Sequence, residues 1–376
     1  MRLPLILAMF LTSATVNAQW TIQDSHTTAD LRGIHSLGNG IAWASGTNGT
    51  VLRTTDDGAT WQTCTTPPDA DKLDFRGIQA FDANIAIVMS SGKGDLSRLY
   101  KTTDACKTWK LLFTNPDKDG FWDGIQGGFE RESGKFDGVL VGDPVDGKFA
   151  IYTQISFHTS WEPWNGSNCL APKCRDAKAN RNESIFAASN SAMVSPGSDG
   201  DLAFVTGGPG GARLVYAQPH GIDGISSFAF STIKLPIPSG ENTGAFSIAR
   251  HGKDPDGINA NFMVVGGDYR KPDSPGTSVY ITIPTSWFFL TPHTVKPIIP
   301  PHGFRSAVTY DADQKTWITV GPNGTDVSTD DGRNWHALKP STTDSPDADK
   351  NWNALSLPFV VGPKGHIGRL RANALQ

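Results

Sequence analysis

An eight-residue turn motif recurs three times in the chain, at 54–61, 102–109 and 328–335. Such an internal repeat constrains the fold more than any local pattern does. Each copy lies between two stretches of alternating polar and apolar residues, which predicts a strand, a turn and a second strand. The Asp carboxylate can accept hydrogen bonds from the turn's backbone, Gly permits positive φ, and Trp can be buried between sheets. The residues assigned to these structural turns are Asp56, Gly58, Trp61, Asp104, Trp109, Asp330, Gly332 and Trp335.

A second pattern, a short apolar strand led by a polar or charged residue, occurs seven times. Its copies start near residues 32, 76, 122, 183, 245, 304 and 352. Equivalent apolar positions, from Ile34 to Leu355, are separated by 44, 47, 60, 63, 59 and 48 residues. These intervals are typical of the four-stranded blades of a β-propeller, with insertions in the middle blades.

A third pattern, an apolar strand that ends in a Gly-rich turn, also occurs seven times, for example at 139–143 and 264–268. The last copy leaves room for only three strands before Gln376, whereas the strand-like segment 20–23 has no blade of its own. Pairing that segment with the last blade would remove two open sheet edges. The prediction is therefore an all-β, seven-bladed β-propeller closed by its N-terminal strand, with an open β-solenoid as the alternative.

The N-terminal residues 1–18 are typical of a signal peptide: Arg2 precedes an apolar run, and the segment ends in Val16-Asn17-Ala18. The run is shorter than the roughly 20 residues that span a bilayer, although a retained N-terminal anchor is the alternative. We expect a mature propeller domain over 19–376, exported to a periplasm or secreted, with no membrane span after signal removal.

All four cysteines lie in the part expected to be exported, where disulfides can persist. Four cysteines allow three pairings. The closeness of Cys169 to Cys174 favours a small loop, and Cys64 and Cys106 would then join two successive repeats. A zinc site is the alternative, but the chain has no C-x-x-C motif and its histidines are scattered.

Charge and motif content exclude several function classes. The formal net charge is −4, with no basic patch for nucleic acid. We expect no metal and no cofactor: the Gly-rich stretch 207–211 lies between two predicted strands and not before a helix, so it is not a dinucleotide-binding loop. The segment 254–257 is similar to the start of a calcium loop, and a turn between strands is the competing interpretation. We expect a monomer.

The three turns are similar to those of the BNR/Asp-box repeat proteins, the group that includes the sialidases. Longer phrases, such as 142–147, 265–272, 305–308 and 353–356, more closely resemble proteins labelled photosystem II stability/assembly factor-like. The resemblance covers nearly the whole chain after residue 18 and implies a propeller fold. The turn motif itself is structural and occurs in enzymes and non-enzymes alike.

In a propeller, the starts of the inner strands and the turns after the second strands lie on one face, at a mouth of the central channel. The motif turns lie on the opposite face. We therefore expect a polar funnel that binds a protein partner, a small acidic ligand or a carbohydrate, with arginines as bidentate anchors. The candidate ligand-binding residues are Arg32, Arg76, Trp122, Asp123, Asp143, Glu183, Asp268, Lys271, Arg305 and Asn353.

Two functions compete for this funnel. The first is binding, as a scaffold or assembly factor. The second is glycoside hydrolysis of the sialidase or a related type, with Asp123, Glu183 and Tyr269 as catalytic residues, although the Arg-Ile-Pro sequence usual in sialidases is missing. Ion pairing across the channel is the structural alternative to both. An insertion over 161–181 could cap the funnel or serve only as a connector.

Overall fold

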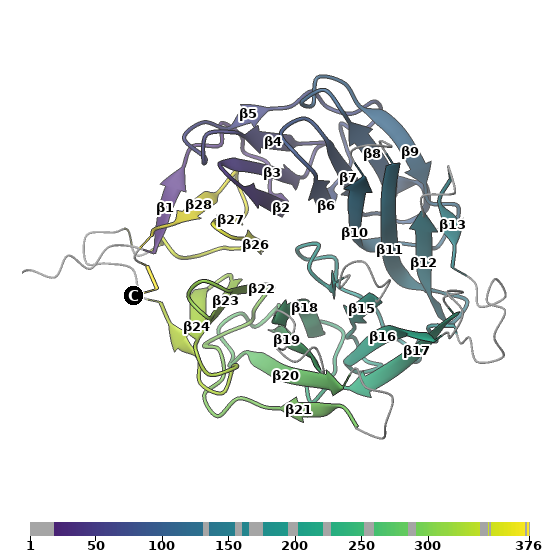
Figure 1. Ribbon diagram of the computed structural model, residues 1–376, viewed down its shortest axis with the longest axis vertical. Helices are drawn as coiled ribbons and strands as arrows, with labels where there is room; N and C mark the ends of the chain where they lie inside the picture. The colour runs from purple at the N-terminus through teal and green to yellow at the C-terminus, as the bar shows by residue number, and fades with distance from the viewer. Residues whose placement is uncertain are drawn as a thin grey trace, which may run out of the picture.

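The chain forms a ring of seven four-stranded antiparallel sheets, as the computed structural model shows (Figure 1). The structure describes residues 19–130, 135–154, 160–164, 176–194, 202–220, 227–251, 259–284, 291–338, 345, 347–372 and 374–375. The expected signal peptide, Cys169, Cys174 and the turn at 254–257 lie outside these ranges. The seven-bladed propeller expected from the repeats is confirmed.

Each of the first six blades runs from its inner strand to its outer strand in chain order. The strands of the first three blades are β2 (Leu31–Gly38), β3 (Ile41–Gly46), β4 (Val51–Thr54) and β5 (Gln62–Thr63); β6 (Phe75–Ala80), β7 (Ala86–Ser90), β8 (Arg98–Thr102) and β9 (Lys110–Thr114); and β10 (Trp122–Glu130), β11 (Lys135–Val145), β12 (Lys148–Gln154) and β13 (Glu162–Pro163). A 3-10 turn, η1 (Gly94–Leu96), precedes β8.

The next three blades follow the same order. Their strands are β14 (Met193–Val194), β15 (Leu202–Val205), β16 (Arg213–His220) and β17 (Ser227–Lys234); β18 (Thr243–His251), β19 (Asn259–Asp268), β20 (Thr277–Pro284) and β21 (His293–Val295); and β22 (Ala307–Asp311), β23 (Thr316–Gly321), β24 (Gly324–Ser328) and β25 (His336–Ala337). None of the described helices is long and apolar enough to cross a membrane.

The seventh blade joins the two ends of the chain, as predicted. It consists of β26 (Ala354–Ser356), β27 (Phe359–Val361), β28 (Ile367–Leu370) and, as its outer strand, β1 (Trp20–Gln23). The β1–β28 register places Trp20 opposite Leu370 and Gln23 opposite Ile367. The ring is therefore closed by backbone hydrogen bonds and not by side-chain packing alone.

The three motif turns share one hydrogen-bond pattern. In the first, the Thr54 hydroxyl donates to Asp56 at 2.8 Å and accepts from the Gly58 N–H at 3.0 Å, and the Thr60 N–H donates to Asp56 at 2.9 Å. The same bonds recur around Asp104 and Asp330. These bonds lower the pKa of Asp104 to about 2, the largest contribution coming from the Thr108 hydroxyl.

The Trp that ends each motif binds the preceding blade. The indole N–H of Trp61 donates to Gln23 at 2.9 Å, that of Trp109 to the Thr65 carbonyl at 2.9 Å, and that of Trp335 to Ser278 at 2.8 Å. All three rings are buried. Each turn therefore fastens one blade to its neighbour, which explains why its sequence is so restricted.

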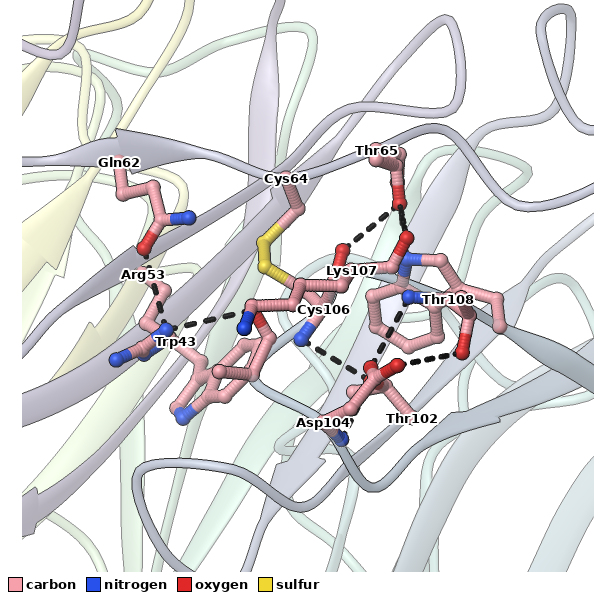
Figure 2. Close-up of a disulfide and its surroundings, with 12 residues drawn as sticks. Trp43, Arg53, Gln62, Cys64, Thr65, Thr102, Asp104, Cys106, Lys107 and Thr108 are labelled. Carbon is pink, nitrogen blue, oxygen red and sulfur yellow. Dashed lines mark hydrogen bonds between the residues drawn. A yellow bond between two sulfur atoms is a disulfide. The ribbon is translucent and has the colours of Figure 1, made fainter.

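One disulfide adds a covalent link between the first two blades. Cys64, just after β5, is bonded to Cys106 in the second motif turn (Figure 2), which confirms the expected pairing of these two residues. Cys106 takes the place that Gly58 and Gly332 hold in the other two turns, and it has the same positive φ, 59°. In the second turn, a disulfide-bonded cysteine therefore stands at the position of the glycine.

Candidate functional site

Two arginines lie together at the channel mouth. Arg32 and Arg76 begin the inner strands β2 and β6, and their side chains are 31% and 29% exposed. Both face Asp74: the Arg76 Nε donates to it at 2.8 Å, and the Arg32 Nε lies 3.9 Å from it. Two guanidinium groups against one carboxylate leave an excess of positive charge, and both remain partly open to solvent.

A segment of the chain itself crosses the channel near these arginines. Residues 185–191, here called the channel segment, precede β14 and project into the ring (Figure 1). The Asn190 side chain accepts from the Ile125 N–H at 2.9 Å, Ser189 donates to the Ser306 carbonyl at 2.9 Å, and Ser191 lies 2.7 Å from Ser247. The channel segment thereby touches the third, fifth and sixth blades.

This arrangement departs from the sequence expectation for the fourth blade. The inner strand expected near residue 183 begins instead at Met193 and is only two residues long. Ser184 still forms an isolated bridge to Gly207, but the chain then turns into the channel. The channel is therefore not an open funnel, and a ligand at the mouth would lie across a floor.

Arg76 and Asp143, both expected to bind ligand, hold this floor in place. The Arg76 Nη1 donates to the Ala187 carbonyl at 3.2 Å, and the Ile185 N–H donates to Asp143 at 2.9 Å. Burial raises the pKa of Asp143 to about 6, although the Ile185 hydrogen bond favours the ionised form. The two residues have a positioning role toward the channel segment, and Arg76 also faces the solvent.

Asp123 lies deeper, at the bulge where β10 begins, and is 1% exposed. The backbone N–H groups of Asp143 and Ala187 approach the carboxyl, but neither carboxyl oxygen makes a hydrogen bond of normal geometry within the described part of the chain. Burial, followed by the charge of Asp143, raises the pKa of Asp123 well above its usual value, while Arg76 acts in the opposite direction. The Asp123 carboxyl therefore belongs to the interior, where burial favours its neutral form.

Glu183 is also committed to the interior. Its carboxylate accepts from the Arg213 Nε at 2.7 Å, from the Thr206 hydroxyl at 2.6 Å and from the Asn180 N–H at 2.6 Å. Both oxygens are occupied and the side chain is fully buried. Tyr269, by contrast, is 42% exposed. The three residues expected to catalyse glycoside hydrolysis thus lie in three different environments, and no contact between any two of them is found among the described residues.

The other expected ligand residues divide between structure and surface. Arg305 is 0% exposed and pairs with Asp326, and Trp122 is buried and stacks on Phe113 with the ring centres 5.3 Å apart. Asn353 donates to the Leu31 carbonyl at 2.8 Å, which joins the seventh blade to the first. Asp268 accepts from the Arg270 N–H. Lys271 is 72% exposed at the mouth.

An aromatic group faces the arginines across the mouth and was not foreseen as a unit. Phe186 of the channel segment stacks on Phe246 with ring centres 4.1 Å apart. Tyr269 meets both rings edge-on, and Phe304 packs against Phe246. In the sequence, Phe246 stands at one leading position and Phe304 precedes another, but only the path of the channel segment brings Phe186 into the group.

His302 shapes the pH dependence of stability at the sixth blade. Its Nδ1 lies 2.7 Å from Asp326, and this hydrogen bond raises the histidine pKa above its usual value. The folded protein then binds a proton that the unfolded chain releases. The stabilisation is complete below about 6.5, the ordinary histidine pKa, and is lost as pH rises through the folded value.

We expect His302→Gln to lower stability most at acidic pH, with the difference from the parent shrinking above about 6.5. Urea unfolding across this range measures the difference, with the exposed His336→Gln as the matched control. A difference that stays constant with pH would contradict this assignment.

Comparison with known proteins finds the same fold in solved structures of low sequence identity. No protein-family model matches the chain, and no curated protein matches its sequence. A solved structure described as YCF48 bound to D1 peptide matches with a TM-score of 0.59 at 16% identity, covering 95% of this chain and 100% of that one. YCF48 from Cyanidioschyzon merolae matches with a TM-score of 0.58 at 15% identity, covering 94% and 99%. The WD40 propeller domain of Doa1 matches with a TM-score of 0.52 at 10% identity, covering 95% and 97%.

Proposed function

We propose that this chain is a binding and scaffold propeller that takes a peptide segment of a protein partner across its channel mouth. The observation that carries the proposal is the floored mouth: Arg32 and Arg76 on one side, Tyr269 on the other, and the channel segment closing the channel between them. A closed, shallow surface suits an extended peptide better than a small molecule that needs enclosure.

The chemistry of the mouth specifies the partner further. Arginine pairs favour carboxylates through charge-assisted hydrogen bonds, and exposed Tyr favours apolar or aromatic side chains. The expected segment therefore carries an acidic residue and an apolar one. The similarity in fold to YCF48, which has been solved bound to a D1 peptide, supports a peptide-binding role, and we propose a similar assembly-factor role for this chain.

Export completes the proposal. We propose that residues 1–18 are removed as a signal peptide and that the protein acts in a periplasm or outside the cell. The Cys64–Cys106 disulfide supports this location, since such bonds persist mainly in oxidising compartments.

Fluorescence anisotropy with labelled synthetic peptides tests the binding role. Three peptides share one apolar sequence flanked by Asp, Ser or Lys. The Asp-flanked peptide should bind, and Arg76→Ala or Arg32→Ala should weaken it about tenfold, the effect of losing one charge-assisted hydrogen bond. Arg333→Ala, an exposed arginine in the turn on the opposite face, is the matched control.

Two outcomes would overturn the binding role. One is equal affinity for all three peptides, because the arginines would then select nothing. The other is an unchanged affinity in both mouth variants with the fold intact by circular dichroism. Because Arg76 also holds the Ala187 carbonyl, Arg32→Ala is the variant that separates ligand binding from movement of the floor.

A further inference from the structure

A separate cavity of about 530 Å³ opens on the seventh blade, at the seam where the N-terminal strand β1 joins the C-terminal strands. It is bounded by the end of β1 and the chain after it, by the turn between β27 and β28, and by Asn351 ahead of β26. None of the mouth arginines lines it. Its volume lies within the range usual for small-molecule sites.

Backbone hydrogen bonds fix the walls of this seam cavity. The Gly365 N–H donates to the Ala29 carbonyl at 2.7 Å, and the Asn351 N–H donates to the Pro322 carbonyl at 2.8 Å. The Lys364 N–H donates to the Asp30 carboxylate at 3.1 Å. The approach is so close that a Cβ on Gly365 would lie 2.0 Å from the Thr27 carbonyl oxygen. The cavity is thus formed before any ligand arrives.

Polar groups on the walls are left with hydrogen-bonding capacity. No described residue forms a hydrogen bond with the side-chain amide of Asn351 or with the ammonium group of Lys364. The Ser25 and Thr27 hydroxyls each accept a backbone N–H, at 3.4 and 3.2 Å, so that their hydrogens remain to be donated. An amide both donates and accepts, and a hydroxyl does the same. The site therefore suits a ligand whose own groups do both, as alcohol hydroxyls do.

Flat apolar surface completes the lining. The His366 ring is stacked on the buried Trp352 ring, with centres 4.3 Å apart and planes within 17°. Burial lowers the pKa of His366 and so favours the neutral ring. Pro363 and the 46% exposed Ile22 add further apolar surface. Such surfaces match the carbon-bearing face of a sugar ring.

The two charged residues on the walls have opposite signs: Asp24 carries a negative charge and Lys364 a positive one. The cavity therefore has no net charge to select an ion. We infer that the seam cavity is a binding site for a neutral, hydroxyl-rich small molecule of the monosaccharide class, distinct from the peptide surface at the channel mouth.

Isothermal titration and saturation-transfer NMR with glucose, galactose, mannose and N-acetylglucosamine test the site, with glycine and inorganic phosphate as ionic comparisons. At least one sugar should bind. Asn351→Gly and Lys364→Gly should each weaken it about three- to tenfold, the effect of one lost hydrogen bond. Glycine is the chosen replacement because both residues have positive φ, 62° and 56°.

The chain offers matched controls. Asn39 and Lys315 are exposed residues in hairpin turns elsewhere, with φ of 49° and 50°, so that Asn39→Gly and Lys315→Gly test the same substitutions away from the cavity. Ile22→Trp, which fills the cavity from its rim, should abolish sugar binding while leaving peptide binding at the mouth unchanged.

Three results would overturn the assignment. The first is that no sugar binds, and the second is that glycine or phosphate binds in its place. The third is sugar binding that survives all three cavity variants but is lost in Arg32→Ala, since the sugar would then occupy the mouth. Failure of the peptide assay does not bear on the seam cavity, because its variants and probes are separate.

Discussion

Replacing Arg305 with methionine is expected to lower the free energy of unfolding by about 3 to 5 kcal/mol, because it leaves the buried Asp326 carboxylate without its guanidinium partner. The Arg305 Nε donates to Asp326 at 2.7 Å, and both side chains are at most 1% exposed. Burial alone would raise the pKa of Asp326, but the His302 hydrogen bond and the Arg305 charge hold it below its usual value.

A second substitution separates the cost of the unpaired charge from the cost of lost packing. Arg305→Met combined with Asp326→Leu removes both charges, and we expect most of the lost stability to return. Urea unfolding of the parent, the two single variants and the double variant forms the cycle, with the exposed Arg333→Met as the control. If the double variant is as unstable as the sum of the singles, the ion pair is not the source of the effect.

Loss of the Cys64–Cys106 disulfide is expected to destabilise the protein by about 4 kcal/mol, the loop-closure entropy for a bridge that spans 42 residues. Both cysteines are buried, so the replacement must also be small. Denaturant unfolding of Cys64→Ala/Cys106→Ala, and of the parent with and without a reductant, measures the loss. A parent whose unfolding midpoint does not shift on reduction would contradict it.

The other two motif turns supply a refinement of this experiment. Cys106 has a φ of 59° at the place where Gly58 and Gly332 stand. Cys64→Ala/Cys106→Gly should therefore be more stable than Cys64→Ala/Cys106→Ala, by about 1 to 2 kcal/mol, since alanine is strained at positive φ. Equal stability of the two double variants would mean that the turn does not constrain this residue.

The fold could be predicted from the sequence because every blade repeats the same turn chemistry and strand spacing. The burial of the residues at the leading positions could not be predicted in the same way, because Arg76 and Arg305 stand in similar sequence contexts. Their partners decide the difference: the Asp74 side chain beside Arg76 is 23% exposed, whereas the Asp326 side chain, on β24 beside Arg305, is 1% exposed.

The channel segment was hidden for a related reason. Asn182–Ile185 matches the repeat, and Ser184 does pair with Gly207 as a strand would. What diverts the chain afterwards is a set of contacts with distant blades, such as Asn190 with Ile125 and Ser189 with Ser306. A sequence repeat reflects contacts within a blade and between neighbouring blades. It does not indicate contacts with distant blades.

Ring closure has a consequence for the order of assembly. Trp20 is among the first described residues to leave the ribosome, yet its partner Leu370 lies 350 positions later. The first six blades consist of consecutive strands and can form as they emerge, whereas the seventh must wait for the last strand. Loop-closure entropy grows only with the logarithm of length, so the wait adds little to the equilibrium cost. It does slow the final step, and until that step occurs the two sheet edges at the seam remain open to other chains.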